Sequence, residues 1–287
     1  MQCRYSQSLG EGFQGTPQEV WGVSDYIDRN KPVVYVGLYD ARDYLALWRH
    51  KGKSYVFWCG GDILNLIRGF LLNDGKLKWL SQYFPAFKFL VKHILSKAEH
   101  WVENHTERDA LFKWGIKKVF VTPSYFGNVD LPITYNHAKP AKVYISCGKN
   151  RQEEYGFDVI EQIASQCVNI EFHLYGDDWQ TQHKNVIIHN RVPIEQMNKE
   201  TADMQCGLRL NEFDGFSEIL AKAVLRGQYA ISKIKYPLIP SYNHNGELVQ
   251  LLNKLTITYQ PNTKVRNFYK QILNNFPWNK YAQIYNK

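Results

Sequence analysis

The segment Leu208-Arg209-Leu210-Asn211-Glu212-Phe213-Asp214-Gly215-Phe216-Ser217 decides how this sequence folds, because an apolar run meets an acidic, glycine-containing turn. Apolar residues then recur at helical spacing up to Gly227. The pattern predicts a strand that leads through a turn directly into a helix. A helix N-terminus leaves backbone N–H groups unpaired and carries partial positive charge, so it suits a phosphate. We therefore expect a phosphate site here, with Glu212 or Asp214 beside it to hold sugar hydroxyls.

The size and composition of the chain are those of a globular protein. Its 287 residues, 44% of them apolar and 15% aromatic, suffice for one large domain or two ordinary ones with buried cores. No apolar run reaches the roughly 18 residues that span a bilayer, and Met1–Gln18 lacks a signal-peptide core. We expect a cytoplasmic protein. The five cysteines are widely spaced, which favours small buried side chains over a metal site or disulfides.

Positive charge is concentrated in two stretches of the chain. The net charge is +8, from 35 Lys and Arg against 27 Asp and Glu. Leu248–Lys287 contains six bases and no acid, and Arg68–Lys97 contains six bases and the single acid Asp74. Both stretches are rich in aromatic residues, and such a basic surface favours an acidic partner. Two solvated basic helix faces would explain the same pattern.

Apolar, β-branched runs alternate with helix-like segments, which predicts parallel sheets built from βαβ units. The chain reads as two successive α/β halves joined by a proline-containing stretch, Asp130–Lys142. An opening strand is not evident in Met1–Asp28. The predicted strands are Pro32–Leu38, Ser54–Cys59, Trp101–Asn104 and Lys118–Thr122, then Lys142–Cys147, Asn169–Tyr175, Asn185–His189, Met204–Leu210, Gln228–Ser232 and Leu255–Tyr259.

Three features of the second half occur together. Asp214-Gly215-Phe216-Ser217 precedes the predicted helix, Gly148-Lys149 follows the first strand, and Leu174-Tyr175-Gly176-Asp177 ends the second. As a set, from Lys142 to about Tyr236, they resemble the retaining, nucleotide-sugar-dependent glycosyltransferases of the GT-B type. The resemblance implies an α/β fold of two Rossmann-like, doubly wound domains facing across a cleft, with the N-terminal domain shortened. The implied division is residues 1–135 (acceptor domain), 141–262 (donor domain) and 263–287 (C-terminal helices that cross back to the first domain).

The resemblance also implies how the donor is held. Lys149 and Arg151 would stabilise the charge that develops on the leaving diphosphate, as fixed cations do. Asp214 or Glu212 would orient the donor sugar, and Arg191 would lie near the base or phosphate. The donor-binding residues implied in this way are Gly148, Lys149, Arg151, Arg191, Glu212, Gly215, Phe216, Ser217, Glu218 and Lys222.

Two positions depart from the family pattern. Lys222 stands where the family has a Glu that accepts hydrogen bonds from the donor ribose, and a lysine has no acceptor. Three readings remain open: Glu218, one helical turn earlier, substitutes for that Glu; Lys222 meets the diphosphate; or donor binding is altered or lost. Tyr155 stands where the family has a Lys, and we expect Arg151 in the same loop to replace it.

The first half carries fewer candidates. Trp58-Cys59-Gly60-Gly61-Asp62 is similar to a strand end and helix start that some of these enzymes place at the cleft. Asp62 is either a helix cap or a catalytic, cleft-facing carboxylate. His105 follows the next strand, where it faces the cleft or serves the structure. With Asp214, these two residues form the predicted catalytic set.

The implied activity is sugar transfer from a nucleotide-sugar donor to a glycan or lipid-linked acceptor in polysaccharide biosynthesis. The resemblance implies retention of anomeric configuration, no metal, and no cofactor besides the donor. Many family members dock on anionic lipid through a basic, aromatic helix. Apolar residues between Leu80 and Leu95, with Lys88 and Lys92 on another face, fit such a helix beginning at Pro85, and would place the protein at the inner membrane face. A core-facing helix with a solvated back fits the same spacing.

Two alternatives come from other classes of function. Some phage enzymes of this architecture glycosylate modified bases in DNA. The basic tail and Arg68–Lys97 would then follow the phosphates, with aromatics such as Trp278 near an extruded base. Lys222 instead favours a degenerate transferase that keeps the fold without catalysis.

Overall fold

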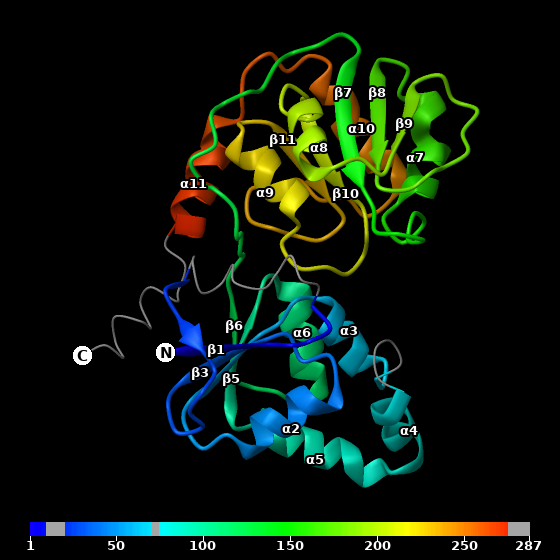
Figure 1. Cartoon of the computed structure of the whole chain (residues 1–287). Coiled ribbons are helices and arrows are strands. Elements are labelled where there is room, and N and C mark those ends of the chain that lie inside the picture. The colour runs from blue at the N-terminus through cyan, green and yellow to red at the C-terminus, as the bar shows by residue number, and fades with distance from the viewer. Residues whose placement is uncertain (10–20, 71–74, 275–287) are drawn as a thin grey trace. The chain divides into compact units, whose positions relative to one another are not determined.

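The computed structural model describes residues 1–9, 21–70 and 75–274, and Figure 1 labels their helices and strands. The described chain forms two compact units, each built on one parallel sheet. The first comprises Met1–Phe126 together with Phe213–Gly215, and the second comprises Gly127–Glu212 and Phe216–Asn274. The predicted α/β architecture with two parallel sheets is therefore confirmed.

The sheet of the first unit has six strands in the order β2-β1-β3-β4-β5-β6. The order reverses at β1, so the carboxyl ends of β1 and β3 border the crevice where ligands of such sheets bind. The prediction missed β1, because its four residues include Arg4 and are too few to show a pattern. The strands are β1 (Gln2–Tyr5), β2 (Ser24–Asp25), β3 (Val33–Val36), β4 (Ser54–Phe57), β5 (Ala98–Val102) and β6 (Val119–Val121).

Alternation along the strands gives this sheet two apolar faces. Residues such as Val33 and Tyr35 pack against helices, whereas Val34 and Val36 join a second cluster that contains Trp21. Most helices begin where the sequence places a cap or a proline: Asp40 forms a capping box on α2, Asn104 caps α6, and Pro85 starts α5 as predicted. The helices are α2 (Ala41–Arg49), α3 (Gly61–Ile67), α4 (Gly75–Tyr83), α5 (Pro85–Leu95) and α6 (His105–Trp114).

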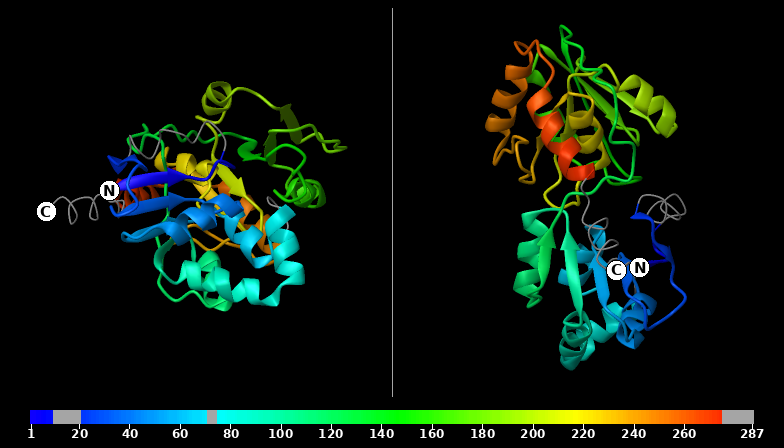
Figure 2. Two further views of the ribbon diagram at one scale, coloured as in Figure 1. Left: turned by 60° about the horizontal axis from the view of Figure 1, so that its bottom comes forward. Right: turned by 90° about the vertical axis from the view of Figure 1, so that its left-hand side faces the viewer.

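The sheet of the second unit has the order β11-β10-β7-β8-β9, which reverses between β7 and β10. Successive β10 residues point to opposite faces: Gly207 meets α9, and Leu208 joins the core with α7 and α10. Figure 2 shows helices on both sides of this sheet. Its elements are β7 (Ala141–Ser146), α7 (Phe157–Ile163), η2 (Ala164–Gln166), β8 (Ile170–Tyr175), β9 (Val186–Asn190), α8 (Ile194–Glu200), β10 (Cys206–Arg209), α9 (Glu218–Leu225), β11 (Tyr229–Ser232), α10 (Asn245–Leu255) and α11 (Thr263–Asn274).

The end of the second unit differs from the prediction. The predicted strand Leu255–Tyr259 is wrong, because Leu248, Leu252 and Leu255 share the buried face of α10, at helical spacing, and residues 256–274 contain no strand. The next helix, α11, packs against α9 of the same unit. The predicted helix Trp278–Tyr285 and residue Trp278 lie outside the described residues.

Two further predictions concern cysteines and membranes. All five cysteines are free, and four of them are buried, which confirms their predicted role as small buried side chains. Among the described residues, no helix has both the length and the apolar character that crossing a bilayer requires.

Candidate functional site

The switch point of the second sheet is built from the loops that follow β7, β8 and β10. Two glycines let these loops approach closely. Gly176 has φ +113°, and a Cβ there would collide with the carbonyl oxygen of Cys147 after β7. Gly156 has φ +89°, and its Cβ would lie 2.5 Å from that of Leu210 after β10. Side chains are therefore excluded at the points where the three loops meet.

Cations surround this switch point. Lys149 and Arg191 are exposed, and neither makes an ion pair with a residue that the structure describes. The Lys149 loop is fixed by Asp177, whose carboxylate accepts from the Asn150 backbone N–H at 2.7 Å. Burial and Asp177 raise the pKa of the Cys147 thiol, and Arg191 and Arg209 act in the opposite direction, so both guanidinium groups lie within electrostatic reach of the β7 end.

Arg151, the other predicted cation, is already engaged. Its guanidinium forms a bidentate pair with Glu154, with Nε 2.7 Å from Oε2, and it lies over the Tyr155 ring at 5.0 Å. The same ring contacts a residue that the sequence prediction missed: Arg209, at the end of β10, is buried and lies 4.1 Å from the ring centroid. Tyr155 thus contacts two arginines. The sequence does contain a signal for Arg209, because a charged residue at the end of an apolar strand is rarely buried without a role.

The turn after β10 is more closely packed than an open phosphate cradle would be. The Phe216 side chain is buried, stacked on Tyr269 with ring centroids 5.1 Å apart, and meets Tyr236 edge-on. Ser217 is the N-cap of α9, and its hydroxyl accepts from the Ile219 N–H at 3.2 Å. The side chain of Phe216 is therefore a packing anchor, and only backbone groups of this turn remain as candidates for a phosphate. Glu212 is exposed.

Lys222, which departs from the family pattern, pairs with Glu218. The Lys222 Nζ lies 2.5 Å from Glu218 Oε1, one helical turn away. Each residue thus neutralises the other, and the carboxylate proposed to replace the family Glu is already bound to a cation.

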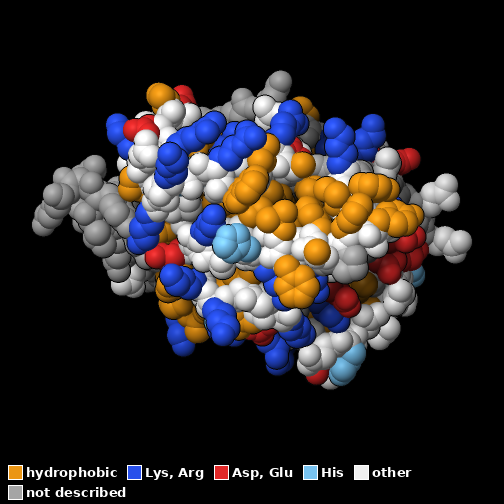
Figure 3. Space-filling model, turned by 90° about the horizontal axis from the view of Figure 1, so that it is seen from below, with side chains coloured by type: hydrophobic (Ala, Val, Ile, Leu, Met, Phe, Trp, Pro, Cys, Tyr) orange, Lys and Arg blue, Asp and Glu red, His pale blue; other side chains and the backbone are white. Residues whose placement is uncertain are grey.

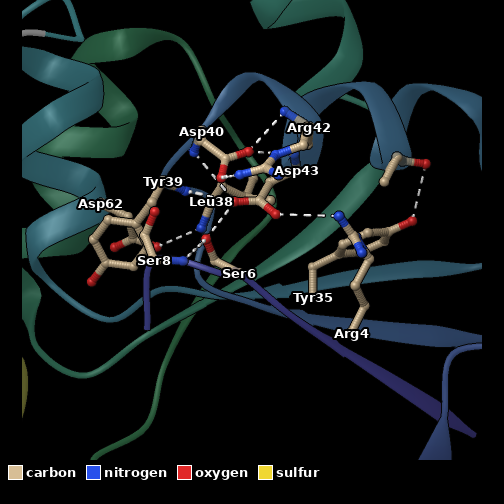
Figure 4. Close-up of polar contacts among 11 residues, drawn as sticks. Arg4, Ser6, Ser8, Tyr35, Leu38, Tyr39, Asp40, Arg42, Asp43 and Asp62 are labelled. Atoms are coloured by element: carbon tan, nitrogen blue, oxygen red, sulfur yellow. Dashed lines mark hydrogen bonds and ion pairs between the residues drawn. The ribbon is translucent and has the colours of Figure 1, made fainter. Parts of the chain in front are cut away.

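In the first unit, Asp62 joins the ends of two strands. Its carboxylate accepts from the backbone N–H groups of Leu38 at 3.0 Å, Cys59 at 3.0 Å and Ile63 at 2.9 Å, and the side chain is fully buried. Figure 4 shows it together with a second buried acid, Asp43, which binds the same loop after β3. Burial raises the pKa of Asp62 to about 7, although the backbone N–H groups act in the opposite direction. This geometry favours a structural role for Asp62, because no part of its carboxylate is exposed to a substrate.

Asp43 also binds backbone N–H groups, those of the loop after β3. It accepts from the Ser6 hydroxyl at 2.5 Å, and from the backbone N–H groups of Tyr39 at 3.1 Å and Asp40 at 3.2 Å. It therefore ties the end of β1 to the loop after β3. The sequence predicts Asp40 and Asp43 to serve a helix N-terminus, and the capping box confirms this.

Two glutamates complete the acidic edge. Glu107 is fully buried; its Oε2 accepts from the Glu103 N–H at 2.8 Å, and its Oε1 has no hydrogen-bond partner. Burial raises the pKa of Glu107 well above its usual value, and Glu103 adds to the rise. The turn residues Asp214 and Gly215 lie against this edge: Asn104 donates to the Asp214 carbonyl at 2.6 Å, and a Cβ on Gly215 would collide with Glu103.

The accessible groups of this edge are few. Tyr39 and Asp214 are half-buried, and His105 is exposed at the first turn of α6. Burial, with Asp62 and other nearby acids, raises the pKa of Tyr39 well above its usual value, so its hydroxyl keeps its proton. Tyr39 was missed because an aromatic residue in a loop gives no distinctive pattern.

The structure thus groups the predicted residues unequally. Gly148, Lys149, Arg151 and Arg191 surround the second switch point, and Asp62 and Asp214 share the acidic edge. His105 lies at the start of α6 beside that edge, without a partner in the part of the chain that the structure describes. Within the same part, no group of three or more His, Cys, Asp or Glu side chains is placed to hold a metal ion.

The sequence has no family model that matches it and no match among curated proteins. Solved structures do match. S. aureus TarM superposes with a TM-score of 0.60 at 14% identity, over 91% of this chain and 56% of TarM. The lipopolysaccharide outer core galactosyltransferase WaaB gives 0.60 at 12%, over 88% and 73%. Anabaena HepE, in complex with UDP-glucose, gives 0.58 at 10%, over 89% and 78%.

These likenesses concern the fold. The predicted resemblance to GT-B glycosyltransferases is confirmed at that level. The chain spans just over half the length of TarM, consistent with the predicted shortening.

Proposed function

We propose that this chain transfers a glycosyl group from a nucleotide-sugar donor, and that the second unit's switch point holds the donor diphosphate. The observation that carries the proposal is a pair of exposed, unpaired cations, Lys149 and Arg191, at the ends of β7 and β9, in a fold whose relatives include a UDP-glucose complex. Ligands of doubly wound sheets bind at this edge. Arginine and lysine are the side chains that proteins use for diphosphates.

The residues around the switch point divide the work. Lys149 and Arg191 offset the charge on the diphosphate. The buried Arg209, which Tyr155 orients, adds positive electrostatic potential at the end of β10. Gly148 allows the backbone to come close to a ligand, and Gly176 lets the loops after β7 and β8 meet. Asp214 or Glu212 orients the sugar. With these cations in place of a metal, we propose a metal-independent reaction that retains anomeric configuration. An activity that EDTA abolishes, or a product of inverted configuration, would contradict that part.

Donor binding tests the site assignment. We expect Lys149→Ala/Arg191→Ala to weaken UDP binding at least tenfold by titration calorimetry, because each lost phosphate contact costs roughly 1–2 kcal/mol. The matched control is Lys184→Ala/Lys199→Ala, which removes two exposed cations elsewhere on the same unit. Equal effects of the two double variants would show that only net charge matters.

Catalysis must be measured separately from donor binding. Lys222 stands where the family has a Glu, and this favours the alternative of a protein that binds a donor without transferring its sugar. Release of free nucleoside diphosphate from a panel of UDP-, GDP- and ADP-sugars, with and without candidate acceptors, separates the two. We expect turnover with one donor class. Tight UDP binding with no release from any donor would instead establish the non-catalytic alternative.

We further propose that the acceptor is a glycan or lipid-linked glycan presented at an anionic membrane surface. The outer faces of α4 and α5 and the residue between them expose five large hydrophobic side chains: Trp79, Tyr83, Phe84, Phe89 and Leu90. Figure 3 shows a band of hydrophobic side chains with Lys and Arg around it. We call these five residues the aromatic face. The prediction of a core-facing helix holds for Val91, Ile94 and Leu95, which are buried. The outer face of α5 is not purely polar, however, because it carries Phe89, which is 74% exposed.

A neighbouring pocket has the composition of a site for part of a lipid. It measures about 300 Å³ and is lined by Leu66, Phe70 and Phe87, with Arg68 and Lys88 also present. Apolar walls with adjacent cations suit an acyl or isoprenoid segment next to a phosphate.

Vesicle binding tests the membrane part. We expect the protein to sediment with phosphatidylglycerol vesicles and not with phosphatidylcholine vesicles, and Trp79→Ser/Phe89→Ser to reduce this binding at least tenfold. The control is Val168→Ser/Ile257→Ser, two side chains exposed by 75% and 69% on the second unit. Tight, salt-sensitive binding to duplex DNA, unaffected by the aromatic variant, would favour a DNA acceptor instead.

A further inference from the structure

A second concentration of cations lies on the first unit, next to the acidic edge described above. A depression of about 240 Å³ is bounded by α2, by β1 and by the segment after β2. Four of its seven lining residues are arginines: Arg4, Arg29, Arg42 and Arg49. No acid is among the seven.

The helix periodicity explains how α2 contributes to it. Arg42, Leu45, Ala46 and Arg49 are spaced i, i+3, i+4 and i+7, which puts them on one face of the helix. The two arginines on this face are separated by about 10 Å along the axis, at 1.5 Å rise per residue. Arg4 from β1 and Arg29 from the loop before β3 supply the opposite wall.

The guanidinium groups are only weakly engaged by the protein. The Arg4 contact with Asp43 is long, at 3.5 Å, and the buried Nε of Arg4 has no hydrogen-bond partner among the residues that the structure describes. Arg42 reaches its neighbour Asp40 at 3.4 Å. Figure 4 shows both contacts. Arg29 and Arg49 are exposed and make no ion pair within residues 1–9, 21–70 and 75–274.

Further observations place these side chains around one space. Burial raises the pKa of Tyr35, and Arg4 and Arg29 both act against that rise, so the two guanidinium groups lie near the same phenol. The Tyr35 hydroxyl donates to the Ala46 carbonyl of α2, at 3.1 Å. Tyr35 thus joins β3 to Ala46, a lining residue of the depression on α2, and two of the four arginines lie near its phenol.

Four like charges in one depression repel each other, and folding alone gains nothing from bringing them together. Two of the four face a carboxylate, which leaves two positive charges for a ligand. Arginine presents planar N–H donors that match phosphate oxygens, and a site with several of them selects phosphate over a single carboxylate.

We propose that this depression binds a compact anion with two or more phosphate groups, either free in solution or as part of a lipid headgroup. The site is on a different unit from the proposed donor site and does not depend on the proposed transferase activity.

The test uses Arg29→Gln/Arg49→Gln, because these two side chains have the fewest contacts. Tripolyphosphate is titrated calorimetrically into the Lys149→Gln/Arg191→Gln protein, in which the candidate donor site is removed, with and without the two arginine changes. We expect binding in that background, and at least a tenfold loss when Arg29 and Arg49 are changed. Lys184→Gln/Lys199→Gln, with the same loss of charge on the second unit, should leave binding within twofold. Absence of tripolyphosphate binding, or an equal loss in the control, would overturn a site for free phosphates.

Vesicles decide the source of the phosphate. If the ligand is a lipid headgroup, Arg29→Gln/Arg49→Gln weakens binding to vesicles with 20% cardiolipin at least fivefold while the control does not. Cardiolipin binding and tripolyphosphate binding that are both unchanged by the arginine variant refute the site altogether. A structural role is excluded separately, because it predicts a lower melting temperature for the variant, whereas relief of repulsion predicts an unchanged or higher one.

Discussion

The carboxyl edges of the two sheets have the same architecture and opposite chemistry. The edge of the first unit is lined with acids, Asp43, Asp62, Glu103 and Glu107, all buried. The edge of the second is lined with cations, of which Lys149 and Arg191 are exposed. In both units, parallel strands and the helices that follow them direct backbone N–H groups toward this edge.

The difference shows two ways of satisfying those groups. In the first unit the protein supplies its own anions: Asp62 and Asp43 each accept from several loop N–H groups, which fixes the edge. In the second unit Asp177 accepts from one loop N–H, and the exposed side chains Lys149 and Arg191 add positive charge, which we propose an external anion neutralises. We infer that the acids of the first edge mainly make the loops rigid, and that the cations of the second edge mainly serve ligand binding.

The largest expected effect tests how closely the loops of the second edge must meet. Gly176→Ala should lower the free energy of unfolding by about 3 kcal/mol, because alanine is strained at φ +113° and its Cβ meets the Cys147 carbonyl. Gly148→Ala in the same edge is the control, since its Cβ would meet nothing closer than 3.5 Å. Urea denaturation measures both; equal losses would show that the approach of β7 and β8 loops is not tightly constrained.

The second edge could be predicted from sequence because its signals are local. Gly148-Lys149 and the acidic turn before α9 stand next to predicted elements, and the strand and helix periodicity there is regular. Arg209 and Tyr155 could not be paired in advance, since 53 positions separate them and only the fold brings the ring beneath the guanidinium.

The first edge was harder to predict because its acids act at long range. Asp62 accepts from Leu38, 24 positions earlier, and Asp43 accepts from Ser6, 37 positions earlier. β1, which carries Ser6 to this place, is too short to show a pattern. A carboxylate after a strand looks the same in sequence whether it faces a substrate or a backbone N–H, so the sequence leaves both readings of Asp62 open.

The next effect concerns proton binding at the first edge. The pKa of Asp62 is about 7 in the folded protein, against an ordinary value of 3.8, so the folded state holds this proton more tightly than the unfolded state. Wild-type stability should therefore fall relative to Asp62→Asn as the pH rises from about 4 to about 7, by roughly 1 kcal/mol per pH unit, and the difference should stay constant above that range.

Asparagine is a suitable reference because, like the protonated acid, it keeps one acceptor oxygen and does not ionise in this range. Unfolding by urea at pH 4.5, 5.5, 6.5 and 7.5 gives the difference directly. Glu212→Gln, an exposed acid of the other edge, should show no such trend. A constant difference between wild type and Asp62→Asn across the range would mean that Asp62 is ionised throughout, and that the backbone N–H groups outweigh its burial.

The smallest expected effect concerns the number of unpaired cations at the second edge. Glu218→Gln removes the partner of Lys222, which lies 2.5 Å away in a helical pair whose carboxylate is exposed, and should lower the free energy of unfolding by about 0.3–0.5 kcal/mol. The loss should disappear in 1 M NaCl, where the Debye length is about 3 Å. If the edge favours external anions, the same change should tighten UDP binding about twofold, because Lys222 gains freedom to approach a phosphate. Weaker UDP binding would instead mean that the Glu218 carboxylate itself contacts the donor, as the family glutamate does.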